Sequence, residues 1–164
     1  MSICYSVDRT NKTTNNTAVR RHNSILGILV MLLPLTSPAE QSQTFGDYTI
    51  HYNAFTTDIL EPSVARIYKI PRSKNRVLLN ISVLKKVMGT TGQPVSAKIQ
   101  ATATNLSAQV KTLEMREIRD KGAFYYIAET PVSNEETLIF TLHITPNDEA
   151  ITHTITFQEQ FFTD

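Results

Sequence analysis

Residues 72–85 read RSKNRVLLNISVLK, a basic lead-in that runs directly into the most apolar strand candidate of the chain. Alternate positions of this strand candidate are all apolar and fall on one face of an extended chain: Val77, Leu79, Ile81 and Val83. The other face is mixed, with leucines at its ends and polar residues between: Leu78, Asn80, Ser82 and Leu84. The pattern predicts a central strand with one face in a core and the other face covered at its ends.

The chain has 164 residues, and its composition points to a nearly neutral domain. Of the 16 Lys and Arg and the 15 Asp and Glu, four basic residues and one acidic residue precede residue 40, which leaves 12 basic and 14 acidic side chains. Such a balance gives no argument for a nucleic-acid partner or an anionic membrane surface. The single cysteine, Cys4, also lies in the leading segment, so residues 40–164 have no thiol for disulfides, redox chemistry or metal binding.

Residues 20–39 have the three parts of a secretory signal peptide. Arg20 and Arg21 are followed by an apolar run over 25–35 and by small residues that end at Ala39. The apolar run is too short to span a bilayer, which takes roughly 20 residues. We therefore expect cleavage after Ala39, export to the periplasm by the general secretory route, and no transmembrane anchor afterwards.

Residues 1–19 are polar, rich in Asn and Thr, and without periodicity. They predict either a disordered leader or sequence upstream of the true translation start. Because a signal peptide begins shortly before its basic residues, Val19 is our candidate for that start.

Residues 40–164 are expected to form a single all-β domain. Apolar and polar residues alternate in further stretches, with turn residues between them: 43–45, 48–55, 95–104, 123–129, 138–145 and 151–161. In 108–118 the apolar residues fall out of phase, and a bulge near Lys111 or Thr112 would reconcile them. Pro62 and a helical spacing predict one short helix over about 61–69. Together, the regularly spaced strand candidates and turns predict an immunoglobulin-like antiparallel β-sandwich of seven or eight strands.

Histidine is the first candidate for chemistry, because only His51, His143 and His153 remain after residue 39. A four-residue loop over 147–150 would place His143 and His153 on opposite faces of a hairpin. A loop of three or five residues would place them on the same face, so the register decides. Since zinc sites need three or four ligands, we assign no metal ligand and no cofactor.

The sequence gives no catalytic constellation. Glu114 and Glu117 flank Arg116, while Glu135 and Glu136 occupy a turn, so neither pair has the arrangement of an acid and a base. A nucleophile elbow, a His-Glu-x-x-His motif and a phosphate-binding glycine loop are all missing from the sequence. We therefore expect no catalytic residues and no enzyme, with a hydrolase as the least favoured alternative.

Two groups of side chains are candidates for binding a partner. The basic run Arg72, Lys74 and Arg76, with Lys69 nearby, could hold an anionic group, or it could form a solvated loop that protects a sheet edge. Tyr125 and Tyr126 must point to opposite faces of a strand, so one ring is expected outside the core, where it could contribute to a ligand surface.

Several blocks of the sequence, in order, resemble one family of small exported proteins of Gram-negative bacteria, the domain of unknown function 4426 family. The blocks are QTFGDY at 43–48, HYNAF at 51–55, RSK at 72–74, LNISVL at 79–84, ATNL at 103–106, REIR at 116–119, YYIAE at 125–129, VSN at 132–134 and FQ at 157–158. The resemblance covers essentially all of 41–162 and implies a periplasmic β-sandwich whose signal peptide is cleaved. It implies no activity and no site residues.

These observations predict an uncharacterised, non-enzymatic periplasmic protein that binds another macromolecule or a component of the cell envelope. The alternative is a binding protein for a small ligand, such as a sugar or a peptide, that uses Tyr and Arg side chains. A concave pocket lined by Tyr125 or Tyr126 would favour the small ligand, whereas a flat apolar patch or an open strand edge would favour a protein partner.

Overall fold

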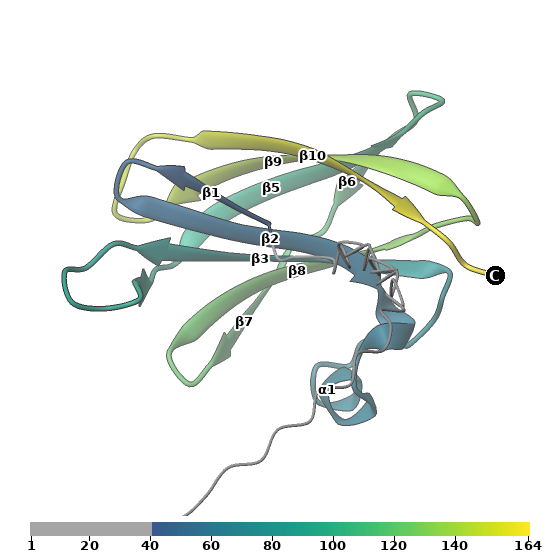
Figure 1. The fold of residues 1–164 in the computed structure, drawn as a ribbon, viewed down its shortest axis with the longest axis horizontal. Coiled ribbons are helices and arrows are strands. Elements are labelled where there is room, and N and C mark those ends of the chain that lie inside the picture. Colours follow the sequence, from purple (N-terminus) through teal and green to yellow (C-terminus); the bar gives the residue numbers. More distant parts are fainter. Residues whose placement is uncertain (1–40) are drawn as a thin grey trace, which may run out of the picture. The chain divides into compact units, whose positions relative to one another are not determined.

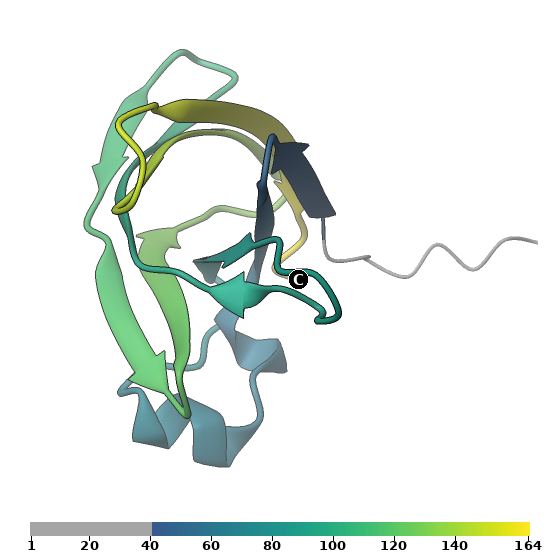
Figure 2. The same ribbon diagram turned by 90° about the vertical axis from the view of Figure 1, so that its left-hand side faces the viewer.

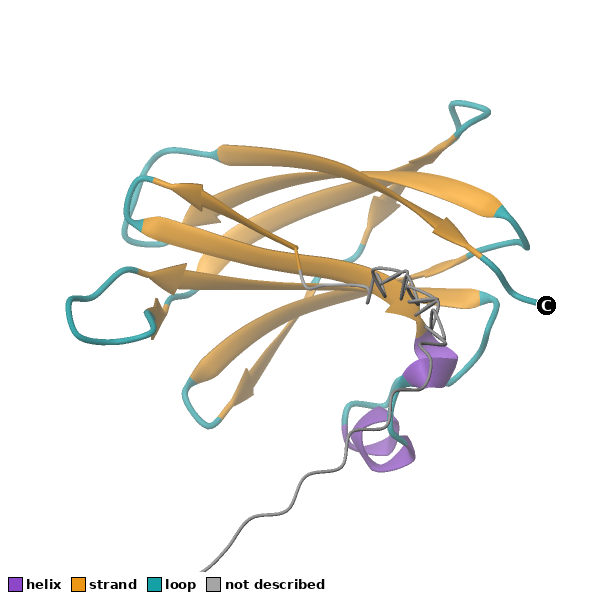
Figure 3. Cartoon of the chain, in the orientation of Figure 1, coloured by secondary structure: helices purple, strands orange, loops and turns teal. Residues whose placement is uncertain are grey.

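The computed structural model describes residues 41–164, which form two antiparallel sheets packed as a sandwich (Figure 1). Strands account for most of this segment, as the colouring of Figure 3 makes clear. The all-β prediction is therefore confirmed. The expected leader and signal peptide fall outside the described residues. Within residues 41–164, no helix has the length and apolar character needed to cross a membrane.

The larger sheet has six strands in the order β1-β2-β3-β8-β7, with the short β4 paired to the end of β3. Their bounds are β1 (Gln41–Phe45), β2 (Tyr48–Thr56), β3 (Arg76–Lys85), β4 (Gln93–Pro94), β7 (Arg116–Asp120) and β8 (Ala123–Pro131). The smaller sheet has the order β10-β9-β5-β6, with bounds β5 (Ala97–Asn105), β6 (Val110–Leu113), β9 (Glu136–Pro146) and β10 (His153–Phe161). The strand predicted to be central, β3, lies in the middle of the larger sheet.

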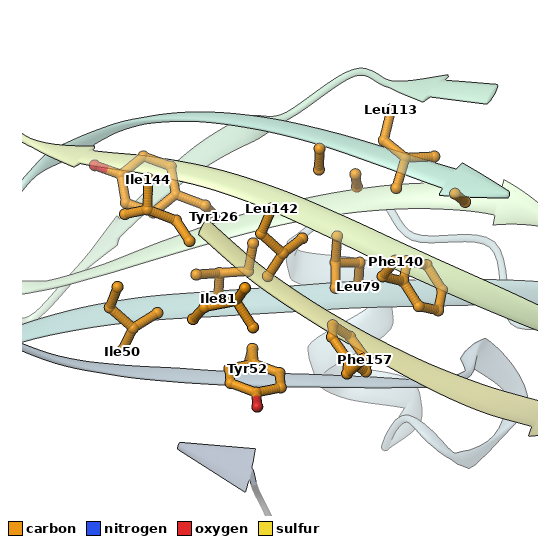
Figure 4. Close-up of a cluster of buried hydrophobic side chains, with 14 of the residues drawn as sticks. Ile50, Tyr52, Leu79, Ile81, Leu113, Tyr126, Phe140, Leu142, Ile144 and Phe157 are labelled. Atoms are coloured by element: carbon orange, nitrogen blue, oxygen red, sulfur yellow. The ribbon is translucent and has the colours of Figure 1, made fainter. Parts of the chain in front are cut away.

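The core lies between the sheets (Figure 4). It is built largely from apolar residues that the alternating pattern of the sequence predicts to face inward. All four apolar residues of the first face of β3 are buried there, opposite the inward face of β9, which carries Leu138, Phe140, Leu142 and Ile144. Aromatic rings close one side of this core, since the Phe157 ring centroid lies 4.7 Å from that of Tyr52 and 5.0 Å from that of Phe140. Aromatic pairs at such distances add to the stability gained by burial.

Residues 41–164 contain ten strands rather than seven or eight, and the difference has two sources. One is the two-residue β4. The other is the stretch 108–118, where the bulge prediction is wrong: β6 belongs to the smaller sheet and β7 to the larger one. The apolar residues are out of phase because the chain changes sheets at Glu114 and Met115. Leu113 then packs in the main core and Ile118 on the outer face of the larger sheet.

The predicted helix is confirmed as α1 (Pro62–Ile67), which follows a single 3-10 turn, η1 (Thr57–Ile59). Figures 1 and 2 show both on the side of the larger sheet that faces away from the smaller one. There a second apolar cluster is buried, made of Ile70, Leu78 and Ile127. This cluster explains why the second face of β3 carries Leu78.

Candidate functional site

The outer face of the larger sheet carries a hollow of about 320 Å³, which we call the outer hollow. Its floor is apolar and comes from four strands, with Phe55 on β2, Leu78 on β3, Ile127 on β8 and Ile118 on β7. The segment that contains η1 and α1 forms the opposite wall with Leu60, Val64, Tyr68 and Ile70. An apolar hollow of this size is large enough for a small organic molecule.

Thr57 fixes the η1–α1 segment to the sheet. Its side chain is fully buried, and its hydroxyl donates to the carbonyl of Pro71 at 2.8 Å and accepts from the backbone N–H of Ser73 at 2.9 Å. These bonds join Thr57, where the chain leaves β2, to the residues just before β3. They therefore close residues 57–73 into a loop. The wall of the outer hollow is thereby held in place by buried hydrogen bonds.

The two ends of α1 are well capped for so short a helix. The Glu61 carboxylate accepts from the backbone N–H groups of Ser63 and Val64, which satisfies free donors at the N-terminus. At the C-terminus, the N–H of Ile70 bonds to the carbonyl of Ala65, and the N–H of Lys69 bonds to that of Arg66. This is a Schellman motif, and its left-handed residue is Lys69, with φ 55°.

The Schellman motif turns the chain so that Tyr68 and Ile70, on either side of Lys69, both line the outer hollow. The polar groups around the hollow are Tyr68, Asn80, Asp120 and Tyr125. Tyr68 lies close enough to Asp120 and Tyr125 to interact with both electrostatically, and burial followed by the Asp120 carboxylate raises the pKa of Tyr68. Polar groups from the residue that caps the end of α1 and from β3, β7 and β8 therefore converge on one apolar space.

A second hollow of about 350 Å³ adjoins the outer hollow and shares Tyr125 with it. It is lined by His51 and Ser82 on the same sheet face, by Gly92 in the β3–β4 loop and by Pro94 on β4. Asn53, the cross-strand neighbour of Asn80, lies on this same sheet face, and its Oδ1 atom is buried without a hydrogen-bond partner. Within residues 41–164, the outer face of the larger sheet thus carries one buried acceptor without a partner, Asn53 Oδ1, beside its apolar surface.

Asp148, in the β9–β10 loop, ties the two sheets together at this end of the sandwich through Tyr48 and Lys85. The Asp148 carboxylate accepts from the Tyr48 hydroxyl at 2.8 Å and from Lys85 Nζ at 2.6 Å, and these two donors lower the pKa of Asp148. His153 Nε2 lies 3.1 Å from Glu149 Oε2, and its ring stacks on Phe45 with centroids 4.7 Å apart. An open hollow of about 550 Å³ lies beside these groups, but their polar atoms already have partners within the protein.

The register of the β9–β10 hairpin settles the relative position of two histidines. His153 pairs with Ile144, as a four-residue loop predicts, so His143 and His153 lie on opposite faces. His143 Nδ1 lies 3.0 Å from the Thr154 hydroxyl on the exposed face. Among residues 41–164, no three His, Cys, Asp or Glu side chains are grouped so that they could hold a metal ion.

The three cationic residues predicted to bind a partner lie on two different elements, a loop and a strand. Arg72 and Lys74 lie on the loop between α1 and β3 and do not line the outer hollow. Arg72 donates to the backbone carbonyl of Asp58, while Arg76 lies on β3 with its Nη1 atom 3.5 Å from Glu129 Oε2. A joint role of these cations in binding a partner stays a prediction.

The two predicted tyrosines lie on opposite faces of β8, one exposed and one buried. Tyr125 is 38% exposed and lines the outer hollow, so one ring lies outside the core as expected. Tyr126 is only 4% exposed, and its hydroxyl accepts from the N–H of Ala97 at 2.8 Å and donates to Glu117 Oε2 at 2.9 Å. The Tyr126 ring therefore lies in the core and its hydroxyl joins the two sheets, so Tyr125 is the ring outside the core, and a role of Tyr126 in partner binding stays a prediction.

Three residues of the outer hollow were missed as site residues by sequence reasoning: Tyr68, Asn80 and Asp120. Asn80 was visible as a polar residue on the mixed face of β3, and Leu78 beside it predicted a covering element. Tyr68 and Asp120 gave no such signal, since one follows a short helix and the other belongs to a hairpin turn. Only the packing of the η1–α1 segment against the sheet brings them together.

Comparison with known proteins identifies the family but not a function. The protein-family model described as "Domain of unknown function (DUF4426)" matches residues 42–164 of this chain. A crystal structure of a DUF4426 family protein from Pseudomonas aeruginosa PAO1 is similar, with 35% identity, a TM-score of 0.65, and coverage of 76% of this chain and 96% of that one. No curated protein matches the sequence.

More distant solved structures share the fold alone. FetP from uropathogenic E. coli strain F11, expressed in the periplasm of E. coli, has 13% identity and a TM-score of 0.53, with coverage of 77% of this chain and 95% of that one. A copper-bound variant of FetP has 14% identity and a TM-score of 0.52, with coverage of 77% and 97%. The match of the family model over 42–164 and the 35% identity to the Pseudomonas protein show that the chain belongs to the DUF4426 family, whose function is unknown.

Proposed function

We propose that this protein is a periplasmic, non-enzymatic binding module that holds a small, largely apolar ligand in the outer hollow. The observation that carries the proposal is the convergence of polar groups from four elements on an apolar space of about 320 Å³. Ligand sites in proteins typically combine a largely apolar lining with a few placed polar groups. The predicted signal peptide over 20–39 supports the periplasmic location.

The arrangement of Tyr125 favours a small ligand over a flat partner surface. Its ring forms part of the wall of two adjoining hollows and is only partly exposed. The neighbouring wall is fixed by the buried hydroxyl of Thr57. A hollow whose walls are held before binding loses little conformational entropy when a ligand enters.

A neutral fluorescent probe, N-phenyl-1-naphthylamine, tests the proposal. We expect its emission to rise on addition of the protein and to be lost with Ile118→Trp, which fills the outer hollow from β7. Val110→Trp on β6, at an exposed position of the other sheet, is the matched control and should bind the probe like the unchanged protein. Circular dichroism checks that both variants fold. Equal binding by Ile118→Trp would place the probe elsewhere and refute the proposal.

A macromolecular partner is the second candidate, and two exposed isoleucines favour it. Ile59 on η1 is 67% exposed and Ile67 on α1 is 70% exposed, so both offer apolar surface to a partner. Crosslinking in the periplasm followed by mass spectrometry tests this candidate. The double variant Ile59→Ser and Ile67→Ser should lose the captured partner, whereas replacing Arg72, Lys74 and Arg76 by Ser tests the predicted basic site separately.

A further inference from the structure

The charges that line the outer hollow have one sign. Among the residues of 41–164 that line it, Asp120 is the one carboxylate and none is Lys, Arg or His. The neighbouring base, Arg119, points to the other face of β7, where its Nε atom pairs with Glu117 Oε1 at 2.5 Å. Within residues 41–164, Asp120 forms no ion pair with a basic side chain. An anionic ligand would therefore meet a carboxylate without a compensating cation.

Aromatic side chains surround the same space. Phe55, Tyr68 and Tyr125 come from β2, from the end of α1 and from β8, and all three line the outer hollow. Burial and the Asp120 carboxylate raise the pKa of Tyr68, so its phenol stays neutral at physiological pH. The electron-rich faces of aromatic rings attract cations, above all substituted ammonium groups, which lose little hydration on entering such a site.

Hydrogen-bond acceptors complete this environment. The side chain of Asn80 lines the outer hollow, and its amide oxygen is a hydrogen-bond acceptor. An ammonium group brings donors and a positive charge, which is the complement of a carboxylate, an amide oxygen and aromatic faces.

We infer that the outer hollow binds an organic ammonium ion, in which an amine or quaternary ammonium group is carried on an apolar body. The apolar body lies on Leu78, Ile118 and Ile127, while the charged group faces Asp120 between Tyr68 and Tyr125. This inference rests on the proposed function, because it names the chemical class of the ligand for the same hollow.

Three ligands with the same aromatic body and different charge test the inference: phenethylammonium, 2-phenylethanol and 3-phenylpropionate. Titration calorimetry with the unchanged protein should give the tightest binding for the cation, about tenfold tighter than for the neutral alcohol. The anion should bind most weakly. Asp120→Asn should remove most of the preference for the cation over the alcohol and leave the affinity for the alcohol unchanged. Asp47→Asn, in the exposed β1–β2 turn, is the matched control and should change neither affinity.

The outcomes separate this inference from the proposed function. If the alcohol binds as tightly as the cation, or if Asp120→Asn leaves the preference for the cation intact, the ammonium assignment is overturned and the small-ligand function stands. If N-phenyl-1-naphthylamine binds in the outer hollow but none of the three ligands does, the ammonium assignment is again overturned. If neither the naphthyl probe nor any of the three ligands binds, both proposals are overturned.

Discussion

The hydroxyl of Tyr126, on the larger sheet, accepts a hydrogen bond of 2.8 Å from the backbone N–H of Ala97, on the smaller sheet. The same hydroxyl donates to Glu117 Oε2 at 2.9 Å. One buried side chain thus provides a polar link between layers that otherwise meet through apolar contacts at this place. This link explains why a tyrosine rather than a phenylalanine occupies an inward position of β8.

Tyr126→Phe is expected to lower the free energy of unfolding by about 1–3 kcal/mol, because it leaves the N–H of Ala97 buried without an acceptor. Urea denaturation monitored by circular dichroism measures the change. Tyr125→Phe, one residue earlier and partly exposed, is the control and should stay within about 0.5 kcal/mol of the unchanged protein. Equal effects of the two substitutions would show that the link between Tyr126 and Ala97 contributes nothing.

Thr57→Val is expected to destabilise the protein by about 1–3 kcal/mol and to weaken probe binding in the outer hollow. The valine has the same shape but leaves the carbonyl of Pro71 and the N–H of Ser73 without their partner. Thr57→Ser, which keeps the hydroxyl, should restore both stability and binding. Thr156→Val, at an exposed position of β10, should have neither effect, and full probe binding by Thr57→Val would contradict the role given to this anchor.

Lys69→Gly is expected to stabilise the protein by about 1 kcal/mol, because Lys69 adopts the left-handed φ of 55° that closes the Schellman motif of α1. Lys69→Ala keeps the strain and should leave the thermal midpoint nearly unchanged. Differential scanning calorimetry of the three proteins measures the effect. A lower midpoint for Lys69→Gly would mean that the Lys69 side chain stabilises the helix end by more than its backbone strain costs.

Glu159→Gln is expected to stabilise the protein at pH 7 and to have no effect at about pH 3.5. Glu159 lies on the inward-facing side of the edge strand β10, and burial raises its pKa above the ordinary value of 4.5. The ionised carboxylate therefore destabilises the fold at pH values above its folded pKa, and the penalty disappears once both the folded and the unfolded chain are protonated.

Urea denaturation at the two pH values measures the effect of Glu159→Gln. The exposed Glu135, in the turn before β9, provides the control, and Glu135→Gln should not show this pH dependence. A stabilisation by Glu159→Gln that persists at about pH 3.5 would show that the benefit comes from the amide itself and not from removing a buried charge.

The inward faces of β3 and β9 could be predicted from the sequence because each is buried on one side against a continuous core. A period of two then decides which residues point inward, from Val77 to Val83 and from Leu138 to Ile144. The short helix was predictable for a similar local reason, since Pro62 suits the first position of α1. These features depend on interactions within a few residues or on burial of a whole face.

The change of sheet between Leu113 and Ile118 could not be predicted in this way. An apolar pattern that slips by one residue fits a bulge and a sheet change equally well, and only the position of the other strands distinguishes them. The choice between Tyr125 and Tyr126 was open for the same reason, because alternation places them on opposite faces without saying which face is covered. The outer hollow depends on the packing of η1 and α1 against β3, β7 and β8, which no local pattern encodes.

The most direct test of the binding role of the outer hollow is the change in backbone amide NMR shifts during titration of residues 40–164 with phenethylammonium and, separately, with N-phenyl-1-naphthylamine. We predict that the largest shift changes fall on Tyr68, Asn80, Ile118 and Tyr125, on the outer face of the larger sheet. If the largest shift changes fall on the smaller sheet, or around His153 at the open hollow of about 550 Å³, the account is contradicted.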